Sequence, residues 1–221
     1  MNALVPAITL NSIFLTLLLA CAGRWNYWPA WVYAATGLVM SVLTRLVLRH
    51  NPELLDERRK PKLDAKNWDK KLLGLGFLLT IAMLIAAGLD ARRSHVNSVL
   101  SWPASIIGLS LNLVGMGIFS WSLRENRFFS SVVRIQTDRG HAVCDTGPYS
   151  LVRHPGYAGM IVGTIGLPLL FMSVWSAVPA LLFVLITVVR TGLEDRVLQA
   201  ELSGYREYCE TTRYRLVPGI W

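Results

Sequence analysis

The sequence predicts an all-α protein: a polytopic membrane bundle of about five to six transmembrane helices that ends in a helical hairpin and contains no Rossmann domain. Hydrophobic residues make up 53% of the 221-residue chain and charged residues only 16%, whereas a typical soluble domain carries about 25% charged residues. The mean hydropathy is +0.42. Several segments are apolar around the whole helix circumference, and a soluble core of this size could not bury that much apolar surface.

The first two spans are long apolar runs near the start of the chain. A bilayer core about 30 Å thick requires roughly 20 apolar residues per helix. The run Leu4–Ala22 meets this requirement, and Trp31–Leu48 follows it. The second span is preceded by Tyr27, Trp28 and Pro29, and such aromatic side chains are typical of the membrane interface. No basic region precedes the long first run, so we expect a retained helix rather than a cleaved signal peptide.

Four further spans follow in the order Leu72–Leu89, Val99–Leu123, Tyr157–Phe171 and Ala177–Val189. The last two are shorter than the others, and the link between them, around Trp175, is too short for a folded loop. We therefore expect a helical hairpin. Three residues are expected to loosen or bend its first arm: Gly163, Gly166 and Pro168.

The basic residues predict the orientation of the bundle. Arg45–Lys71, Arg124–Arg153 and Arg190–Trp221 hold nine, five and five Lys and Arg residues, which is 19 of the 22. Because such an excess marks the cytoplasmic side, we expect these segments and both termini there, as in a bacterial inner membrane. Membrane topology then accounts for the net charge of +8 without a nucleic-acid partner. The charged connector Asn51–Lys71 is expected to be a solvated loop at the lipid headgroups.

We expect one integral membrane domain, residues 1–221, in which residues 1–123 form scaffold helices and residues 124–221 form the cofactor-binding and catalytic half. The cysteines Cys21, Cys144 and Cys209 are odd in number, far apart and without a C-x-x-C pair. This pattern indicates free thiols and neither a disulfide nor a metal site.

A cluster at residues 153–157 suggests an anion site. The His154–Pro155 step disfavours a helical conformation at His154, and proline suits the first turn of a helix. The free N–H groups of that turn would lie beside Arg153, His154 and Tyr157 and would suit a carboxylate. Interfacial anchoring of the Arg–His pair is the alternative.

A second polar pair lies at the mouth of the last span. Arg190 and Glu194 are spaced i, i+4 and therefore share one helix face. An ionisable residue at membrane depth is a functional candidate. The alternative is that Arg190 extends to the headgroups while Glu194 neutralises it.

A set of motifs between Gln136 and the C-terminus resembles the isoprenylcysteine carboxyl methyltransferase family, which is related to membrane phospholipid methyltransferases. The motifs, in order, are His141, Gly147-Pro148-Tyr149, Arg153-His154-Pro155-Gly156-Tyr157-Ala158-Gly159, Glu194-Asp195-Arg196-Val197-Leu198 and Gly204-Tyr205-Arg206-Glu207-Tyr208. The resemblance implies S-adenosyl-L-methionine as cofactor without a Rossmann fold. The chain agrees in having no G-x-G-x-x-G motif after a strand.

The resemblance also implies roles for individual residues. Arg190 would face the methyl acceptor as the catalytic residue and hold its carboxylate. Glu194 would accept hydrogen bonds from the cofactor, but Asp195 replaces the second Glu of the family pattern, which leaves Asp195 as an alternative. The remaining cofactor-binding residues would be Gln136, His141, Ala142, Val143 and Cys144 at the adenosine end, Tyr149 nearby, and His154, Pro155, Gly156 and Tyr157 at the methionine end.

A methyl sulfonium is already activated, so we expect catalysis mainly by positioning. A carboxylate acceptor needs no general base, whereas a thiol or amine would require one, such as Glu194, His154 or Tyr149. The expected partners are a lipophilic or lipid-linked substrate and membrane lipids. Two other functions stay open: a membrane sterol or enone reductase that uses NADPH, and a non-catalytic membrane scaffold or transporter.

Overall fold

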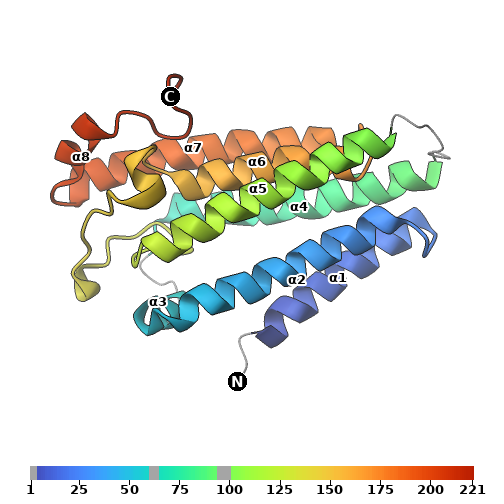
Figure 1. Cartoon of the computed structure of the whole chain (residues 1–221), viewed down its shortest axis with the longest axis horizontal. Helices are drawn as coiled ribbons and strands as arrows, with labels where there is room; N and C mark the ends of the chain where they lie inside the picture. The colour runs from blue at the N-terminus through green and yellow to red at the C-terminus, as the bar shows by residue number, and fades with distance from the viewer. Residues whose placement is uncertain (1–3, 60–64, 94–100) are drawn as a thin grey trace.

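The computed structural model describes residues 4–59, 65–93 and 101–221, and over these residues its regular structure is entirely helical (Figure 1). Five of the described helices are long and apolar enough to cross a membrane, which confirms the predicted polytopic bundle. They are α1 (Leu4–Ala22), α2 (Trp28–Arg49), α4 (Asn67–Arg93), α5 (Ser101–Glu125) and α7 (Ala177–Glu201). The shorter elements are α3 (Pro52–Arg59), α6 (Pro155–Leu170), α8 (Tyr205–Thr211) and two 3-10 turns, η1 (Thr137–Arg139) and η2 (Gly147–Ser150).

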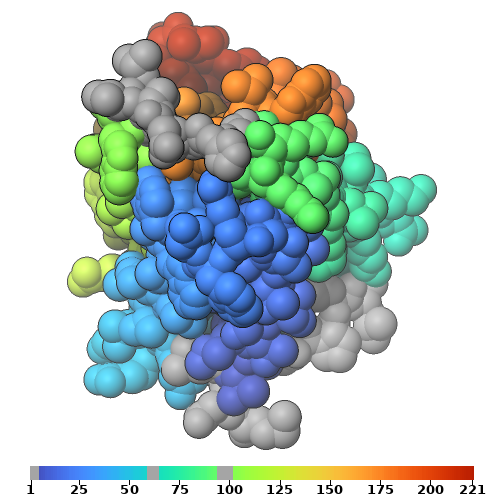
Figure 2. Space-filling view, turned by 90° about the vertical axis from the view of Figure 1, so that its right-hand side faces the viewer, coloured from blue at the N-terminus to red at the C-terminus, as the bar shows by residue number. Residues whose placement is uncertain are grey.

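The bundle has two unlike ends. Figure 1 shows α3, α8 and the segment between α5 and α6 gathered at one end of the bundle. Figure 2 shows the opposite end, where the α1–α2 turn, the start of α5 and the α6–α7 link lie together. Trp28 stacks on Trp102 there, with ring centroids 4.9 Å apart. The Tyr27 hydroxyl donates a hydrogen bond to the Phe171 carbonyl, at 2.8 Å, which ties the α2 entrance to the end of α6.

Glycines bring α5 and α6 into close contact. A Cβ atom at Gly115 would lie 2.5 Å from the Gly159 carbonyl, and one at Gly166 would lie 2.9 Å from Cβ of Leu111. Only glycine allows this approach. Gly166 therefore allows close packing against α5, and α6 is one continuous helix of 16 residues with Pro168 in its last turn.

Helices α4 and α7 extend beyond the spans that hydropathy predicts. The apolar run Ala177–Val189 is only the first part of α7, which continues through charged residues to Glu201. Helix α4 begins at Asn67, so its charged first turn contains Asp69. The start of the fourth expected span, Val99, lies outside the described residues.

The expectation of a solvated loop is wrong for part of the connector. Residues Pro52–Arg59 form α3, and Glu57 and Asp69 are only 1% and 0% exposed. Glu57 pairs with Arg134 and Asp69 pairs with Arg190. These two connector acids are therefore buried in ion pairs with arginines of the C-terminal half. Residues 60–64 of the connector lie outside the described part of the chain.

Candidate active site

A cavity of about 570 Å³ lies between the helices at the end that carries α3 and α8. This volume falls within the roughly 300–1,000 Å³ of small-molecule pockets. Of the expected site residues, Pro155 is buried at the start of α6 and is not part of the cavity wall. The others all line it: Gln136, His141, Ala142, Val143, Cys144, Tyr149, His154, Gly156, Tyr157, Arg190 and Glu194.

The segment after α5 forms a tight loop around Gln136. The Gln136 side chain is 1% exposed and donates through Nε2 to the Phe128 carbonyl at 2.7 Å. Its backbone N–H donates to Nδ1 of His141 at 3.3 Å. Gly140 closes the turn with φ of 62°, a left-handed conformation that favours glycine. The His141 ring packs beside Phe128, with centroids 4.7 Å apart.

The surroundings of this loop keep His141 and Tyr149 uncharged. Burial, and then the charges of Arg134 and Arg139, lower the pKa of His141 to about 4. The imidazole is therefore uncharged near pH 7. Burial raises the pKa of Tyr149 well above its usual value, so its phenol stays protonated. The Tyr208 hydroxyl donates to the Tyr149 carbonyl at 2.5 Å and anchors η2 to α8.

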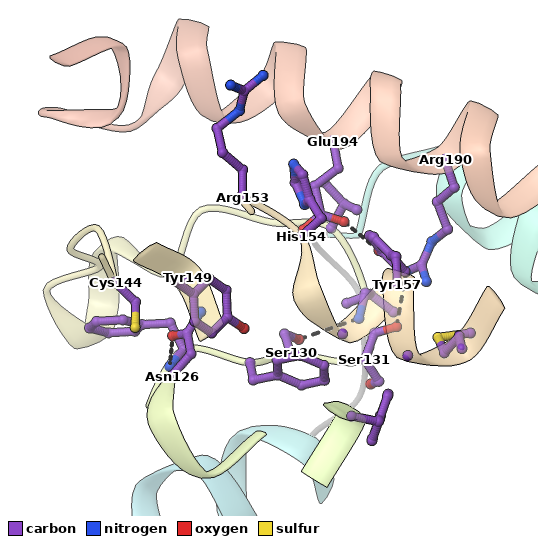
Figure 3. Close-up of a pocket in the computed structure, with 18 of the residues that line it drawn as sticks. Asn126, Ser130, Ser131, Cys144, Tyr149, Arg153, His154, Tyr157, Arg190 and Glu194 are labelled. Carbon is purple, nitrogen blue, oxygen red and sulfur yellow. Dashed lines mark hydrogen bonds between the residues drawn. The ribbon is translucent and has the colours of Figure 1, made fainter. Parts of the chain in front are cut away.

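The RHP segment folds as predicted, with His154 outside the helix and Pro155 in the first turn of α6. Its side chains bind an acid of the protein itself. Arg153 Nε lies 2.8 Å from Oδ1 of Asp195, and His154 Nε2 lies 3.2 Å from the same atom. In Figure 3 the Arg153 guanidinium points away from the cavity toward α7.

Asp195 is a buried centre that holds the C-terminal segment against α6. It is 0% exposed. Besides Arg153 and His154, it accepts hydrogen bonds from Arg215 at 2.8 Å, Gln199 at 2.7 Å and Tyr205 at 3.1 Å. The backbone N–H groups of Arg153 and His154 donate to the carbonyls of Tyr214 and Arg215, both at 2.9 Å.

Glu194, and not Asp195, lines the cavity. Consecutive helical residues point about 100° apart, which separates the roles of these two acids. The Tyr157 hydroxyl donates a hydrogen bond to Glu194 (Figure 3). The Arg190 guanidinium lies 5.1 Å from the centre of the Tyr157 ring. Glu194, Tyr157 and Arg190 thus form a continuous row along one wall.

Arg190 is already paired. Its Nε lies 2.6 Å from Asp69 Oδ1, and its Nη2 reaches Asp69 Oδ2 at 3.3 Å and the Ser131 carbonyl at 3.2 Å. No described residue bonds its Nη1. Arg190 therefore keeps one nitrogen for a ligand. Asp69 was not among the expected site residues, because nothing in its local sequence separates it from the other acids of the connector.

The cavity continues into the apolar interior of the bundle. From Tyr157 to Gly163 along α6 it reaches about 9 Å deeper, at 1.5 Å per residue. Asn112 on α5 donates to the Gly163 carbonyl at 3.4 Å at that depth. The side chains around this deeper part are mostly apolar: Met40, Leu73, Met116, Met160, Leu167 and Phe183. A polar end joined to an apolar interior suits an amphiphilic ligand.

The fold and the cavity define an integral membrane protein with a site between its helices for a ligand that is polar at one end. Residues 103–203, which include most of α5 and all of α6 and α7, match the phospholipid methyltransferase family. Two relatives from Oryza sativa, subspecies indica and japonica, are each named a probable protein-S-isoprenylcysteine O-methyltransferase. Each is 31% identical over 157 residues, which cover 67% of this chain and 74% of the relative. The chain belongs to the isoprenylcysteine carboxyl methyltransferase family of membrane methyltransferases.

Proposed function

We propose that the protein transfers a methyl group from S-adenosyl-L-methionine to a lipophilic acceptor, most favourably a carboxylate of the isoprenylcysteine type. One observation carries the proposal: a single cavity joins the polar residues of the family motifs to an apolar space between membrane helices. A water-soluble cofactor and a lipid-like acceptor would meet at that junction. Because most Lys and Arg residues lie at this end, we propose that it faces the cytosol with both termini.

The polar end of the cavity fits the cofactor. Glu194 offers a carboxylate whose single protein partner in the described structure is the Tyr157 hydroxyl, so its remaining acceptor sites suit an ammonium group or ribose hydroxyls. Neutral His141 and the segment Gln136–Cys144 would surround the adenosine end. His154, Gly156 and Tyr157 would hold the methionine end. The bound cofactor would supply a methyl group on a positively charged sulfur.

The apolar part of the cavity would hold the acceptor chain, and the free Nη1 of Arg190 would orient its carboxylate. A carboxylate is ionised at pH 7 and needs no base. The contribution of the protein is then alignment and exclusion of water, which can supply roughly 7–11 kcal/mol. An amine or thiol acceptor would instead require a base, and Glu194 is the carboxylate on the wall that could serve as one.

We also propose that the chain acts as one unit, residues 1–221, and that residues 124–221 contain the cofactor-binding and catalytic residues. The scaffold half, residues 1–123, still contributes to the wall through α2, α3, α4 and α5.

The direct test is incubation of the purified protein with radiolabelled S-adenosylmethionine and membrane lipids, followed by identification of the labelled product. We expect a methyl ester of a lipophilic acid. Calorimetry with S-adenosylhomocysteine and NADPH separates the alternatives. Binding of NADPH alone would indicate a reductase, and cofactor binding without transfer to any lipid extract would indicate a non-catalytic membrane protein.

A further inference from the structure

Arg58 is a cavity residue outside every family motif. It lies near the end of α3, lines the cavity and is partly buried. Its Nη1 donates to the Phe129 carbonyl at 3.1 Å. In the described part of the chain it forms no ion pair. Burial lowers the pKa of Arg58, yet a guanidinium remains charged in proteins.

The other three arginines of the cavity wall each have a carboxylate partner. Arg134 pairs with Glu57 at 2.7 Å, Arg153 with Asp195 at 2.8 Å, and Arg190 with Asp69 at 2.6 Å; these are the distances between the closest charged atoms. Arg58 alone among them lacks a counter-charge within the described residues. A charge removed from water without a partner is costly, so an anion in the cavity would be favourable beside it.

The position of Arg58 is fixed by packing on both sides. Leu54 of α3 is fully buried and packs with Leu48 and Leu123, which holds α3 against α2 and α5. Phe129, whose carbonyl Arg58 binds, places its ring against the first turn of α6. A Cβ atom at Gly156 would lie only 2.6 Å from that ring. Arg58 is therefore separated by one residue, Phe129, from the segment proposed to hold the methionine end of the cofactor.

We propose that Arg58 binds an oxyanion carried by the lipophilic acceptor. The group is either the carboxylate of a lipophilic acid or the phosphate of a phospholipid headgroup, and both match the guanidinium fork. This inference takes one element from the proposed function, namely that the lipophilic acceptor binds in the cavity. Arg58 thereby determines which lipids enter the cavity. Arg190 orients the acceptor at the reacting end, and two of its nitrogens are held by Asp69.

The test compares charged and neutral members of two probe pairs in binding titrations on detergent-purified protein. The first pair is N-acetyl-S-farnesylcysteine and its carboxamide, and the second is phosphatidic acid and diacylglycerol of equal chain length. Arg58→Gln removes the charge, and Arg58→Lys keeps the charge but lacks the two-pronged geometry of the guanidinium group. Arg49→Gln is the matched control, because Arg49 is an exposed arginine in the last turn of α2, near the same end.

We expect the wild type to prefer the charged member of at least one pair by roughly tenfold, the size expected of one charge-assisted hydrogen bond. The pair that shows the preference identifies the oxyanion as carboxylate or phosphate. Arg58→Gln should weaken the preference, leaving only the part due to Arg190; Arg58→Lys should weaken it less, and Arg49→Gln should leave it unchanged.

The proposal is overturned if the wild type shows no preference in either pair, or if the preference of Arg58→Gln equals that of the wild type. A parallel loss of S-adenosylhomocysteine affinity in Arg58→Gln would also overturn it, because Arg58 would then act by holding the loop at Phe129. Binding is measured without methyl transfer. An inactive wild type that still prefers the charged probe would therefore contradict the proposed function and leave this inference standing.

Discussion

Asp69 and Arg190, which are 121 positions apart in the sequence, form a two-point ion pair at the wall of the cavity. Asp69 Oδ2 also accepts the backbone N–H of Val133 at 2.8 Å. One buried carboxylate thus joins α4, α7 and the loop after α5. The geometry of the wall depends on a residue of the scaffold half.

Asp69→Asn should destabilise the protein, because it leaves the Arg190 charge buried without a partner. Breaking a buried pair in this way costs about 3–5 kcal/mol, which thermal unfolding in detergent would detect. Asp56→Asn is the control, since Asp56 is exposed on α3. Equal unfolding temperatures for the two variants would show that the pair does not stabilise the fold.

Arg190→Ala should lower activity while S-adenosylhomocysteine affinity stays near the wild-type value, because Nη1 is proposed to contact the acceptor. His154→Ala and Glu194→Ala should instead weaken cofactor affinity, which calorimetry measures. Our assignment of Arg190 fails if its alanine variant loses cofactor binding and still turns over at saturating cofactor. Unchanged affinity in both other variants would remove His154 and Glu194 from the cofactor site.

Gly156→Ala should reduce cofactor affinity by at least about tenfold. The added methyl group would meet the Phe129 ring at 2.6 Å, so either the ring or the start of α6 must move. Gly117→Ala is the matched control, because a Cβ atom there has nothing within 4 Å and alanine favours a helix. A second change, Phe129→Leu, should restore part of the affinity, and failure to do so would locate the defect elsewhere.

Asp195→Asn should release the C-terminal segment, since the carboxylate charge holds Arg153, Arg215 and the Tyr205 hydroxyl together. We expect faster tryptic cleavage after Arg213 and Arg215, read by mass spectrometry. The exposed acid Glu207 gives the control Glu207→Gln. Cleavage at the wild-type rate would mean that other contacts suffice to hold the segment.

The stability of the loop should depend on His141 at acid pH. The folded pKa of about 4 lies below the ordinary value of 6.5, so the unfolded chain binds more protons between pH 4 and 6.5. The contribution of His141 to stability is therefore fully present above about pH 6.5 and is lost as the pH falls toward 4. His141→Gln should remove this part of the pH dependence in thermal unfolding. A His141 pKa of 6.5 or above by NMR titration would contradict the prediction.

Hydropathy and local sequence predicted most of the fold. The long apolar runs located α1, α2, α4, α5 and α7, and the His154–Pro155 step located the start of α6. These features are local, so the sequence carries them directly. The length of α7 was underestimated because only its apolar part has a hydropathy signal.

The cavity wall was predicted only where motifs mark it. Asp69 and Arg58 lie in a highly charged connector, and their roles arise from contacts with residues far along the chain. Which of the adjacent acids Glu194 and Asp195 faces the cavity depends on the rotation of α7 about its axis, and that rotation is set by packing against α4 and α6. Spacing alone could not determine it.

The shortness of α6 has a consequence for the surrounding lipid. Its 16 residues reach about 24 Å at 1.5 Å per residue, roughly 6 Å less than the hydrocarbon thickness of an average bilayer. We therefore expect the leaflet beside the α6–α7 link to thin locally toward the helix end, at a cost that grows with acyl-chain length. Short-chain bilayers should accommodate this protein with the least deformation, and thick, sterol-rich ones with the most.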